Sequence, residues 1–331
     1  MKNLLYGSLI GTAVGDMYGL PYEGLSARRI HKMFGNRTQF ALIPFIKGGM
    51  ISDDTDHAVM TVQAFIASGG NPMRFGRSLK RQLMLWLAHL PAGIGMATGR
   101  SIVKMYLGVD MFGCKTGVYS AGNGSAMRAS VLGVLCEDLQ MLKTLNHIST
   151  TLTHTDPKAE HGAYLVALLA WVEARHAKWS EEEIWVFLSC HIDPELWELS
   201  STYTPNERGI TGYMYDTVPA VFWAWRHFRH APLEGMAWLI RQGGDTDTTC
   251  AIFGGIVGIN HYAQLTDMGR WCEPVIRPTF LLKLSEQACH VQHTQVSQRP
   301  IAFAGVRTLC RNLLFLGVVL LHGFRRLLPP Y

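Results

Sequence analysis

The sequence has few charged residues and lacks the cysteine patterns that build zinc knuckles or disulfide frameworks. Asp, Glu, Lys and Arg make up 17% of the 331 residues, whereas hydrophobic residues make up 48%. Disordered and low-complexity chains have the opposite balance, so this chain can bury a large core. The seven cysteines are irregularly spaced and form no CxxC pair. Neither a zinc knuckle nor a disulfide framework is indicated, and we expect a reducing, cytoplasmic setting.

Long apolar runs and targeting signals are also missing. The N-terminal stretch "MKNLLYGSLIGTAVGD" lacks a signal-peptide layout, because its short apolar run meets Asp16 without a cleavage motif. A spanning helix needs about 20 apolar residues. The run "LLFLGVVLL" at 313–321 is shorter, so we predict no transmembrane segment. The formal net charge of +5 is a mild basic bias, which suits an anionic substrate and gives no indication of nucleic-acid binding.

Signals for a β-sheet are absent, and helical signals dominate. No pair of alternating strand patterns is joined by an Asn-Gly or Asp-Gly turn. Ser180 is followed three positions later by Glu183, the pattern of a capping box. Apolar residues recur at helical spacing over residues 3–18, 54–67, 157–176, 180–190, 214–228 and 232–241. We predict an all-α fold with about ten or more helices around one core.

The C-terminal part of the chain has the character of an extension. A polar stretch, "HVQHTQVSQRP", ends at a proline near residue 300, so we assign residues 1–290 to one domain and residues 291–331 to the extension. The apolar run in the extension is flanked by Arg311, Arg325 and Arg326. This favours an amphipathic helix packed on the domain or on a partner over a membrane-surface anchor. We expect the helix to cover an apolar patch and not to contribute to catalysis.

Two short segments concentrate aspartates in front of apolar, helical runs. "ISDDTDHAVM" contains Asp53, Asp54 and Asp56, and "GGDTDTTCAIFGG" contains Asp245 and Asp247. Acidic residues stabilise a helix N-terminus, so either segment alone could be an acidic cap. Carboxylates at this density repel one another, however, and a divalent cation would neutralise them. Carboxylates and hydroxyls are hard ligands that suit Mg²⁺ or Mn²⁺, and two clusters could hold a pair of ions.

The second segment also fits the Asp-x-Asp-x-Thr signature of haloacid-dehalogenase-type phosphatases. In those proteins the first aspartate is a nucleophile at the end of a buried strand. Here the preceding stretch, "PLEGMAWLIRQGG", is typical of a helix that ends in glycine. The chain after Asp247 is also too short for the rest of a doubly wound domain, so we disfavour this interpretation.

Six stretches, taken together, resemble a known family. They are "GSLIGTAVGDMYGLPYEG" (7–24), "SDDT" (52–55), "GNGSAMR" (122–128), "THTDP" (153–157), "GYMYDTVPAVFWAW" (212–225) and "GGDTDTTCAIFGGIVG" (243–258). In this order and at this spacing, over about residues 5–260, they resemble the ADP-ribosylglycohydrolase family, which includes the enzymes that reactivate ADP-ribosylated dinitrogenase reductase. The resemblance implies a compact all-α domain with a two-metal cleft.

The resemblance also implies roles for particular residues. The ligands of two Mg²⁺ or Mn²⁺ ions would be Ser52, Asp53, Asp54, Asp245, Asp247 and Thr248. In "GNGSAMR", Gly122 and Gly124 would let backbone N–H groups approach the ribose and phosphates. Side-chain hydrogen bonds would come from Asn123 and Ser125. His154 would bind on the phosphate side and Tyr213 would stack on adenine, whereas the neighbouring aromatic residues Tyr215, Phe222, Trp223 and Trp225 are expected in the core.

The chemistry that the resemblance implies is hydrolysis of the bond between ribose C1″ of ADP-ribose and an acceptor. Positive charge develops on the ribose, as in glycoside hydrolysis generally, and Glu23 and Asp54 are the candidates that orient the attacking water. Asp16 is expected either to support the metal ligands without binding the metal itself or to contribute to helix packing. The partner would be an ADP-ribosylated protein or an ADP-ribose-containing small molecule, with no nucleic acid required.

One position departs from the family pattern. Arginine-directed relatives often carry an acidic residue beside the acceptor, in a stretch that corresponds to "PAGIG" at 91–95, where this chain has Gly93. The departure weakens the expectation of arginine as the acceptor. It also leaves an alternative open, a catalytically weak or inactive ADP-ribose- or metal-binding protein of the same fold.

Overall fold

The computed structural model describes residues 1–35, 39–40, 42, 48–205, 208–273, 276–302 and 305–326. These ranges contain fifteen α-helices, and their extended elements are two strands of two residues each. Strand β1 (Leu25–Ser26) pairs in antiparallel fashion with β2 (Gly243–Gly244). The prediction of an all-α fold is confirmed.

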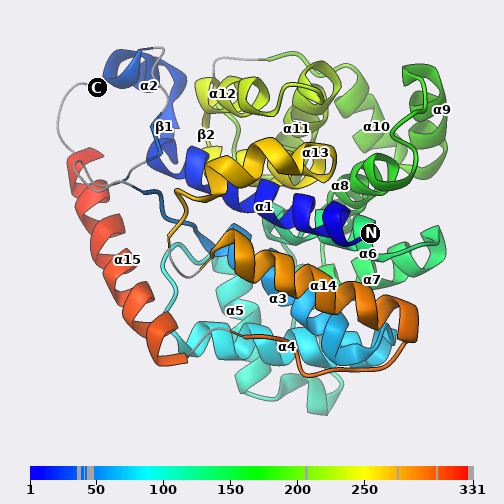
Figure 1. Ribbon diagram of the computed structural model, residues 1–331. Coiled ribbons are helices and arrows are strands. Elements are labelled where there is room, and N and C mark those ends of the chain that lie inside the picture. The colour runs from blue at the N-terminus through cyan, green and yellow to red at the C-terminus, as the bar shows by residue number, and fades with distance from the viewer. Residues whose placement is uncertain are drawn as a thin grey trace.

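Two helices lie backbone to backbone through the centre of the molecule (Figure 1). They are α1 (Lys2–Gly19) and α13 (Thr246–Gly269). Four glycines of α1, spaced four residues apart, face α13: a Cβ atom at Gly7, Gly11, Gly15 or Gly19 would lie 2.0–2.3 Å from a carbonyl oxygen of α13. Only glycine permits this approach. It places the C-terminal half of α1, with Asp16, against the first turns of α13.

The other helices surround this pair. Those of the first half are α2 (Ala27–Phe34), α3 (Asp53–Ser68), α4 (Pro72–Ala88), α5 (Met96–Tyr106), α6 (Ser130–Leu135) and α7 (Leu139–Thr151). Those of the second half are α8 (Pro157–Arg175), α9 (Glu181–His191), α10 (Pro194–Ser201), α11 (Met214–Phe228), α12 (Pro232–Gln242), α14 (Pro278–Thr294) and α15 (Gly305–Arg326). Three 3₁₀ helices connect them, η1 (Leu20–Tyr22), η2 (Val109–Phe112) and η3 (Asn123–Arg128).

Several predicted helices and one predicted cap are confirmed in detail. The range 54–67 corresponds to α3, 157–176 to α8, and 214–228 to α11. At the start of α9 the backbone N–H of Glu183 donates to Ser180 Oγ at 3.2 Å, and the N–H of Ser180 donates to Glu183 Oε2 at 2.7 Å. This reciprocal pair is the predicted capping box.

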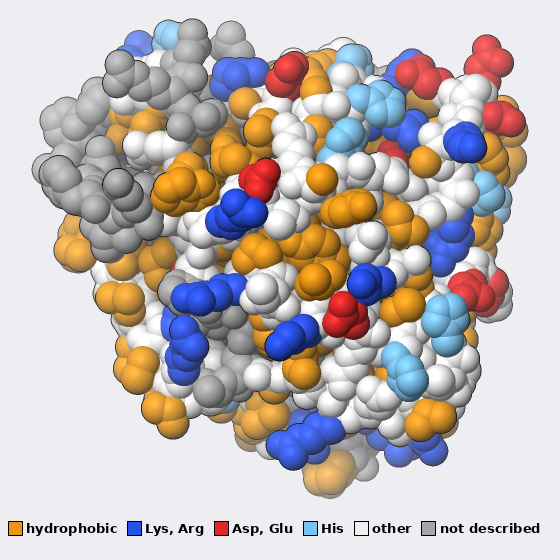
Figure 2. Space-filling view, viewed as in Figure 1, with side chains coloured by type: hydrophobic (Ala, Val, Ile, Leu, Met, Phe, Trp, Pro, Cys, Tyr) orange, Lys and Arg blue, Asp and Glu red, His pale blue; other side chains and the backbone are white. Residues whose placement is uncertain are grey.

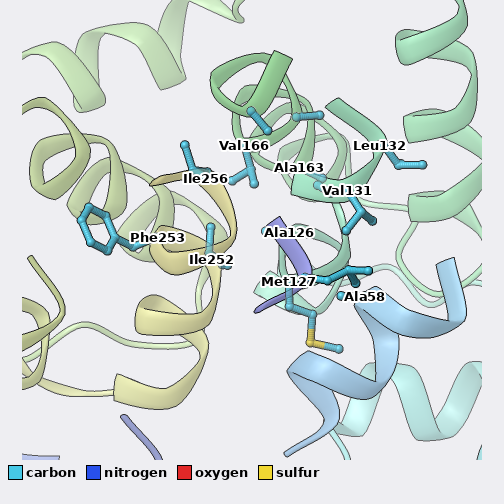
Figure 3. Packing of buried hydrophobic residues seen from close by; sticks show 14 of the residues in the cluster. Ala58, Ala126, Met127, Val131, Leu132, Ala163, Val166, Ile252, Phe253 and Ile256 are labelled. Atoms are coloured by element: carbon cyan, nitrogen blue, oxygen red, sulfur yellow. The ribbon is translucent and has the colours of Figure 1, made fainter. Parts of the chain in front are cut away.

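One apolar core joins the elements that carry the sequence motifs. Figure 3 shows Ile252 and Ile256 of α13 near side chains of η3, α6, α8 and α3, whereas Phe253 points away from them, and its ring lies against Gly235 of α12. The labelled residues are Ile252, Phe253 and Ile256, with Ala126 and Met127, Val131 and Leu132, Ala163 and Val166, and Ala58. All of them are buried. The motif "GNGSAMR" and the starts of α3 and α13 are thus held by rigid, close-packed structure.

The C-terminal extension forms the predicted helix. Helix α14 continues to Thr294, past the predicted boundary at residue 290, and α15 lies apart from the other helices at one edge of the molecule (Figure 1). Phe315 and Val318 of α15 are buried in a small second core. Within α15, residues 305–324 are long and apolar enough to cross a membrane, with 22% of the best window buried. Counting only the run 313–321 therefore underestimated the helix, so its length does not exclude a spanning segment.

Candidate active site

The N-termini of α3 and α13 meet, and with them the two aspartate segments. Ser52 caps α3, and its hydroxyl donates to Asp54 Oδ2 at 3.0 Å. From the other segment, Thr248 Oγ1 donates to the same oxygen at 3.3 Å. Asp54 is 1% exposed. A hydrogen bond to this buried carboxylate oxygen therefore joins Asp54 and Thr248, which are 194 positions apart in the chain.

Asp16 of α1 lies behind this junction and accepts hydrogen bonds from the first turn of α3. The backbone N–H of Ser52 donates to Asp16 at 2.9 Å, and the backbone N–H and hydroxyl of Thr55 donate to Asp16 Oδ2 at 3.1 and 2.5 Å. Burial raises the pKa of Asp16 to about 7, although these hydrogen bonds act in the opposite direction. Asp16 thus fixes the start of α3 to α1, in line with the role expected for it behind the ligands.

The carboxylates of the two segments lie within one another's electrostatic field. Burial raises the pKa of Asp53, Asp54 and Asp247 well above the usual range, and neighbouring carboxylates raise it further. For Asp54 these neighbours are Asp16, Asp53 and Asp245. Each additional negative charge makes ionisation of the next carboxyl harder, so the cluster favours the binding of a cation.

The donor set fits a hard divalent cation. Asp54 Oδ1 is buried without a hydrogen-bond partner, and an ion would satisfy it. The remaining predicted ligands are carboxylates and hydroxyls, the oxygen ligands that Mg²⁺ and Mn²⁺ prefer. As the side chains stand, the described ranges contain no three His, Cys, Asp or Glu side chains around a single ion position. A two-metal cleft at this place therefore stays a prediction.

The glycine-rich motif forms η3 and contacts both α13 and α11. Asn123 Nδ2 donates to Asp245 Oδ2 at 2.7 Å and to Thr217 Oγ1 at 3.0 Å. The backbone of Gly122 pairs with that of Tyr213. Ser125, in contrast, is 1% exposed, and its hydroxyl donates to the carbonyl of Ala159 at 3.1 Å. The Ser125 hydroxyl is therefore engaged with the backbone of α8, and the ligand contact that the resemblance implied for it stays a prediction.

His154 lies directly against the two glycines of the motif. A Cβ atom at Gly122 would be 3.3 Å from His154 Nε2, and one at Gly124 would be 3.0 Å from His154 Cε1. Burial, together with the nearby charge of Arg128, lowers the pKa of His154 to about 3. The imidazole is therefore neutral over the physiological pH range and can donate or accept a hydrogen bond without carrying charge.

Arg128, the last residue of the motif, is a buried cation that the sequence analysis gave no role. It is fully buried, and burial lowers its pKa to about 10. Its guanidinium donates to the carbonyl of Gly124 and to His57 Nδ1, both at 2.9 Å, and to Thr153 Oγ1 at 2.7 Å. It also donates to Ser149 Oγ and the Ser149 carbonyl at 3.0 and 2.8 Å. Arg128 therefore fixes the shape of the motif from the interior of the protein.

Tyr213 stands at the rim of this region. It is 44% exposed and directly precedes α11, and its ring lies 6.2 Å from that of Tyr215. Among the aromatic residues expected in the core, Tyr215, Phe222 and Trp225 are buried. Trp223 is partly exposed and stacks on Trp238 at 4.2 Å. Tyr213 thus presents an accessible ring beside the glycine-rich motif.

Comparison with known proteins assigns the chain to a family. A profile of the ADP-ribosylglycohydrolases matches residues 2–298. The chain belongs to the ADP-ribosylglycohydrolase family. It is 26% identical over 306 residues to an uncharacterized protein of Archaeoglobus fulgidus, covering 86% of this chain and 95% of that protein. It is 24% identical over 274 residues to the ADP-ribosyl-[dinitrogen reductase] glycohydrolase of Rhodospirillum rubrum, covering 77% of this chain and 84% of the relative.

A solved structure shares the fold. The chain of an ADP-ribosylglycohydrolase-related protein complex superposes with a TM-score of 0.66 at 23% identity, over 89% of this chain and 99% of that one. The likeness supports the helical architecture described above.

Two further positions of this glycohydrolase-family chain lie at the rim of the aspartates. Glu23 is exposed, and its charge contributes to the raised pKa of Asp247 and of Asp53. The N–H of Gly24 donates to the carbonyl of Gly244 at 2.7 Å, which ties this turn to the start of α13. Gly93 is also exposed, and a Cβ atom built on it would lie 3.9 Å from Asp53 Oδ1. The departure noted in the sequence therefore falls beside a predicted metal ligand.

Proposed function

We propose that the protein is a metal-dependent hydrolase that releases ADP-ribose from an ADP-ribosylated protein or small molecule by cleaving the bond at ribose C1″. The observation that carries the proposal is the meeting of the two acidic helix N-termini at Asp54, in a chain of this family. If the aspartates only capped their own helices, the two segments would not need to meet. A purely structural role also does not explain why Asp54 Oδ1 is buried without a hydrogen-bond partner.

Two Mg²⁺ or Mn²⁺ ions would be held by the side chains that converge here. Their proposed ligands are Ser52, Asp53, Asp54, Asp245, Asp247 and Thr248. When bound, such ions supply a positively charged template for the hydroxyl groups of the distal ribose. The protein's own contribution is to keep the ligands in place, through Asp16 behind α3 and through Asn123, which donates to Asp245.

The nucleotide part of the substrate would lie along η3. The absence of side chains at Gly122 and Gly124 lets His154 lie against the backbone of the motif, and the anionic oxygens would approach beside it. Neutral His154 borders both glycines and can offer a hydrogen bond without adding charge. Tyr213 offers an exposed aromatic face on which adenine can stack. These residues would orient the substrate with the distal ribose toward Asp54.

Bond cleavage would rely on carboxylates that face the ribose. Positive charge develops on the ribose during cleavage, and a carboxylate that no ion neutralises would stabilise it. Glu23 is exposed and near both segments, so it can orient the attacking water and accept its proton. Asp54 is the second candidate for this role.

The acceptor is proposed to be a group other than arginine. A guanidinium leaving group calls for a carboxylate beside it, and at this place the chain has Gly93, exposed next to Asp53. The same observation supports the second candidate function, a protein that binds ADP-ribose or metal with little turnover.

A panel of substrates tests the proposal and separates the two candidates. The full-length protein is incubated with arginine-, serine- and nucleotide-linked ADP-ribose in the presence of Mg²⁺ or Mn²⁺, and free ADP-ribose is measured. We expect release from at least one linkage other than arginine. Binding of ADP-ribose without release from any member of the panel would favour the binding protein and contradict the hydrolase.

A further inference from the structure

Helix α15 lies outside the family-matched residues 2–298, yet it contacts the segment that leads into α3. Arg311 of α15 pairs with Glu273, and both side chains are more than 90% buried. Arg311 Nε donates to Glu273 Oε2 at 2.8 Å, and its terminal nitrogen Nη2 donates to the carbonyl of Ile51. The N–H of Ile51 donates to Glu273 Oε1 at 3.0 Å. One buried ion pair thus binds both polar backbone groups of the residue that precedes Ser52.

The next residue of α15 holds a second segment of the rim. Asn312 is 0% exposed, and its Nδ2 donates to the carbonyl of His89 at 2.8 Å. Its Oδ1 accepts from Arg311 at 3.0 Å. His89 leads into the loop that contains Gly93, beside Asp53. Two consecutive side chains of α15 therefore hold the main chain at two places, at Ile51 before the acidic segment and at His89 before the loop that contains Gly93.

Apolar packing holds α15 in the position at which Arg311 and Asn312 make these hydrogen bonds. Phe315 and Val318 are buried against Leu20 and Ala92 in the small second core. Leu20 begins η1, the turn that leads to Glu23, and Ala92 directly precedes Gly93. The guanidinium of Arg311 lies 4.7 Å from the centre of the Phe315 ring. The extension is therefore packed against three stretches that carry residues of the candidate site.

We propose that α15 is a working part of the site and that Arg311 is a positioning residue for the metal-ligand segment 52–54. The proposal rests on the proposed function, because it assigns a role toward the cation that this segment would hold. The direction in which the chain enters α3 is set at Ile51, and groups that orient metal ligands from behind control metal affinity. The extension would thus contribute to catalysis, contrary to the expectation from the sequence.

Removing Arg311 would change the affinity for a divalent cation in opposite directions, depending on whether the residue acts through its charge or by positioning the main chain. The carboxylates of Glu273, Asp56 and Asp16 lie in the field of its guanidinium. If Arg311 acted through charge alone, removing it would strengthen the binding of a divalent cation, because like charges repel. If it acts by holding Ile51, removing it weakens that binding. A role confined to stability would lower the unfolding temperature and leave the cation affinity of the folded protein unchanged.

The affinity for Mn²⁺, measured by calorimetry on the full-length protein without substrate, distinguishes these roles. We expect Arg311→Met to weaken Mn²⁺ binding about tenfold or more, in the range found for groups that orient metal ligands. Arg311→Lys keeps the charge and loses the planar fork that reaches Glu273 and Ile51 together, so it should also weaken binding. Arg307→Met removes an exposed arginine one turn earlier on α15 and should leave the affinity unchanged.

The outcomes separate this proposal from the proposed function. Unchanged or tighter Mn²⁺ binding by Arg311→Met, or by Arg311→Lys if the first variant does not fold, would overturn the positioning role. Thermal unfolding of each variant shows whether it is folded. A parent protein that binds Mn²⁺ and releases no ADP-ribose contradicts the hydrolase alone. A parent protein that binds no Mn²⁺ contradicts the metal site, and with it both proposals, before any variant is measured.

Discussion

Asp247 is 6% exposed, and burial and the surrounding carboxylates raise its pKa. Ionising it therefore destabilises the metal-free fold. We expect Asp247→Asn to keep or raise the unfolding temperature of the metal-free protein and to abolish its response to Mn²⁺. In the parent, Mn²⁺ at 100 times its Kd should stabilise the fold by about 2.7 kcal/mol.

Thermal unfolding with and without Mn²⁺ measures both effects. The matched control is Asp267→Asn, which removes an exposed carboxylate from the same helix. A Mn²⁺ response in Asp247→Asn as large as that of the control would remove Asp247 from the ligand set.

Asp16 gives the metal-free protein a particular dependence on pH. Its folded pKa is raised to about 7 from an ordinary value of 3.8, so the fold prefers the protonated carboxyl. The resulting stability is fully present below about pH 4 and is lost as the pH rises through about 7. We expect the free energy of unfolding, measured with denaturant and a chelator, to decline across this window. Asp16→Asn should flatten the decline, and an unaltered slope in that variant would contradict the assignment.

Tyr213 is predicted to stack on the adenine of ADP-ribose. Its ring is accessible beside η3, and stacking of a base on an aromatic side chain is worth about 1–3 kcal/mol. Tyr213→Ala should therefore weaken ADP-ribose binding about tenfold in calorimetry, whereas Tyr213→Phe should bind like the parent. Equal affinity of the alanine variant would leave the ring without a role in binding.

The sequence was informative where several ligand types stand together in a short segment, and uninformative about single polar side chains whose partners lie far away in the chain. The acidic segments are recognisable because several ligand types stand close together in each. Arg128 and Arg311 each make bonds that depend on tertiary structure, such as the pair of Arg311 with Glu273, 38 residues away. No local spacing encodes such a contact. For Ser125 the motif suggested a ligand contact, whereas in the structure its hydroxyl donates to the carbonyl of Ala159 in α8.

At the scale of helices, the contact between α1 and α13 determines where Asp16 and Asp247 lie. A Cβ atom at Gly11 would be 2.0 Å from the carbonyl oxygen of Gly254. We expect Gly11→Ala to destabilise the fold by about 3 kcal/mol or more, because neither backbone can move without opening the core. Gly317→Ala on α15, where nothing lies within 4 Å, should instead stabilise by up to about 1 kcal/mol through helix propensity. Denaturant unfolding of the pair measures the difference, and similar stabilities would show that the helices are further apart than described.

The positions of the helices could be predicted because apolar periodicity and caps are local signals. The range 157–176 and the capping box at Ser180 both rest on residues within a few turns of each other. The close approach of α1 to α13 has a signal as well, in the four-residue spacing of the glycines from Gly7 to Gly19. The pattern of apolar residues does not reveal this contact, because glycine contributes no apolar side chain.

At the scale of the whole molecule, α15 has two different faces. Its inner face carries Arg311, Asn312 and Phe315, and these contact the body. Its outer face leaves large hydrophobic side chains exposed, and Figure 2 shows hydrophobic side chains along the edge of the molecule that α15 forms. The exposed residues are Val306, Leu313, Leu314, Leu316, Leu320, Leu321 and Phe324. Composition predicted the helix and its apolar character, whereas its docking site depends on single polar contacts that composition does not contain.

The release of free ADP-ribose by the parent protein and by Asp54→Asn, measured across a titration of Mn²⁺ with a chelator-treated baseline, tests directly whether the two acidic segments form a metal-dependent active site. Asp54 is the residue at which both acidic segments meet. We expect release by the parent that rises with Mn²⁺ and disappears with the chelator. For Asp54→Asn, folded as judged by thermal unfolding, we expect release at least 100-fold slower at every Mn²⁺ concentration, because Asp54 is a proposed metal ligand and a candidate for proton transfer, a role worth on the order of 10²–10⁴. Release by the parent that is indifferent to the chelator, or equal release by the variant, would contradict such a site.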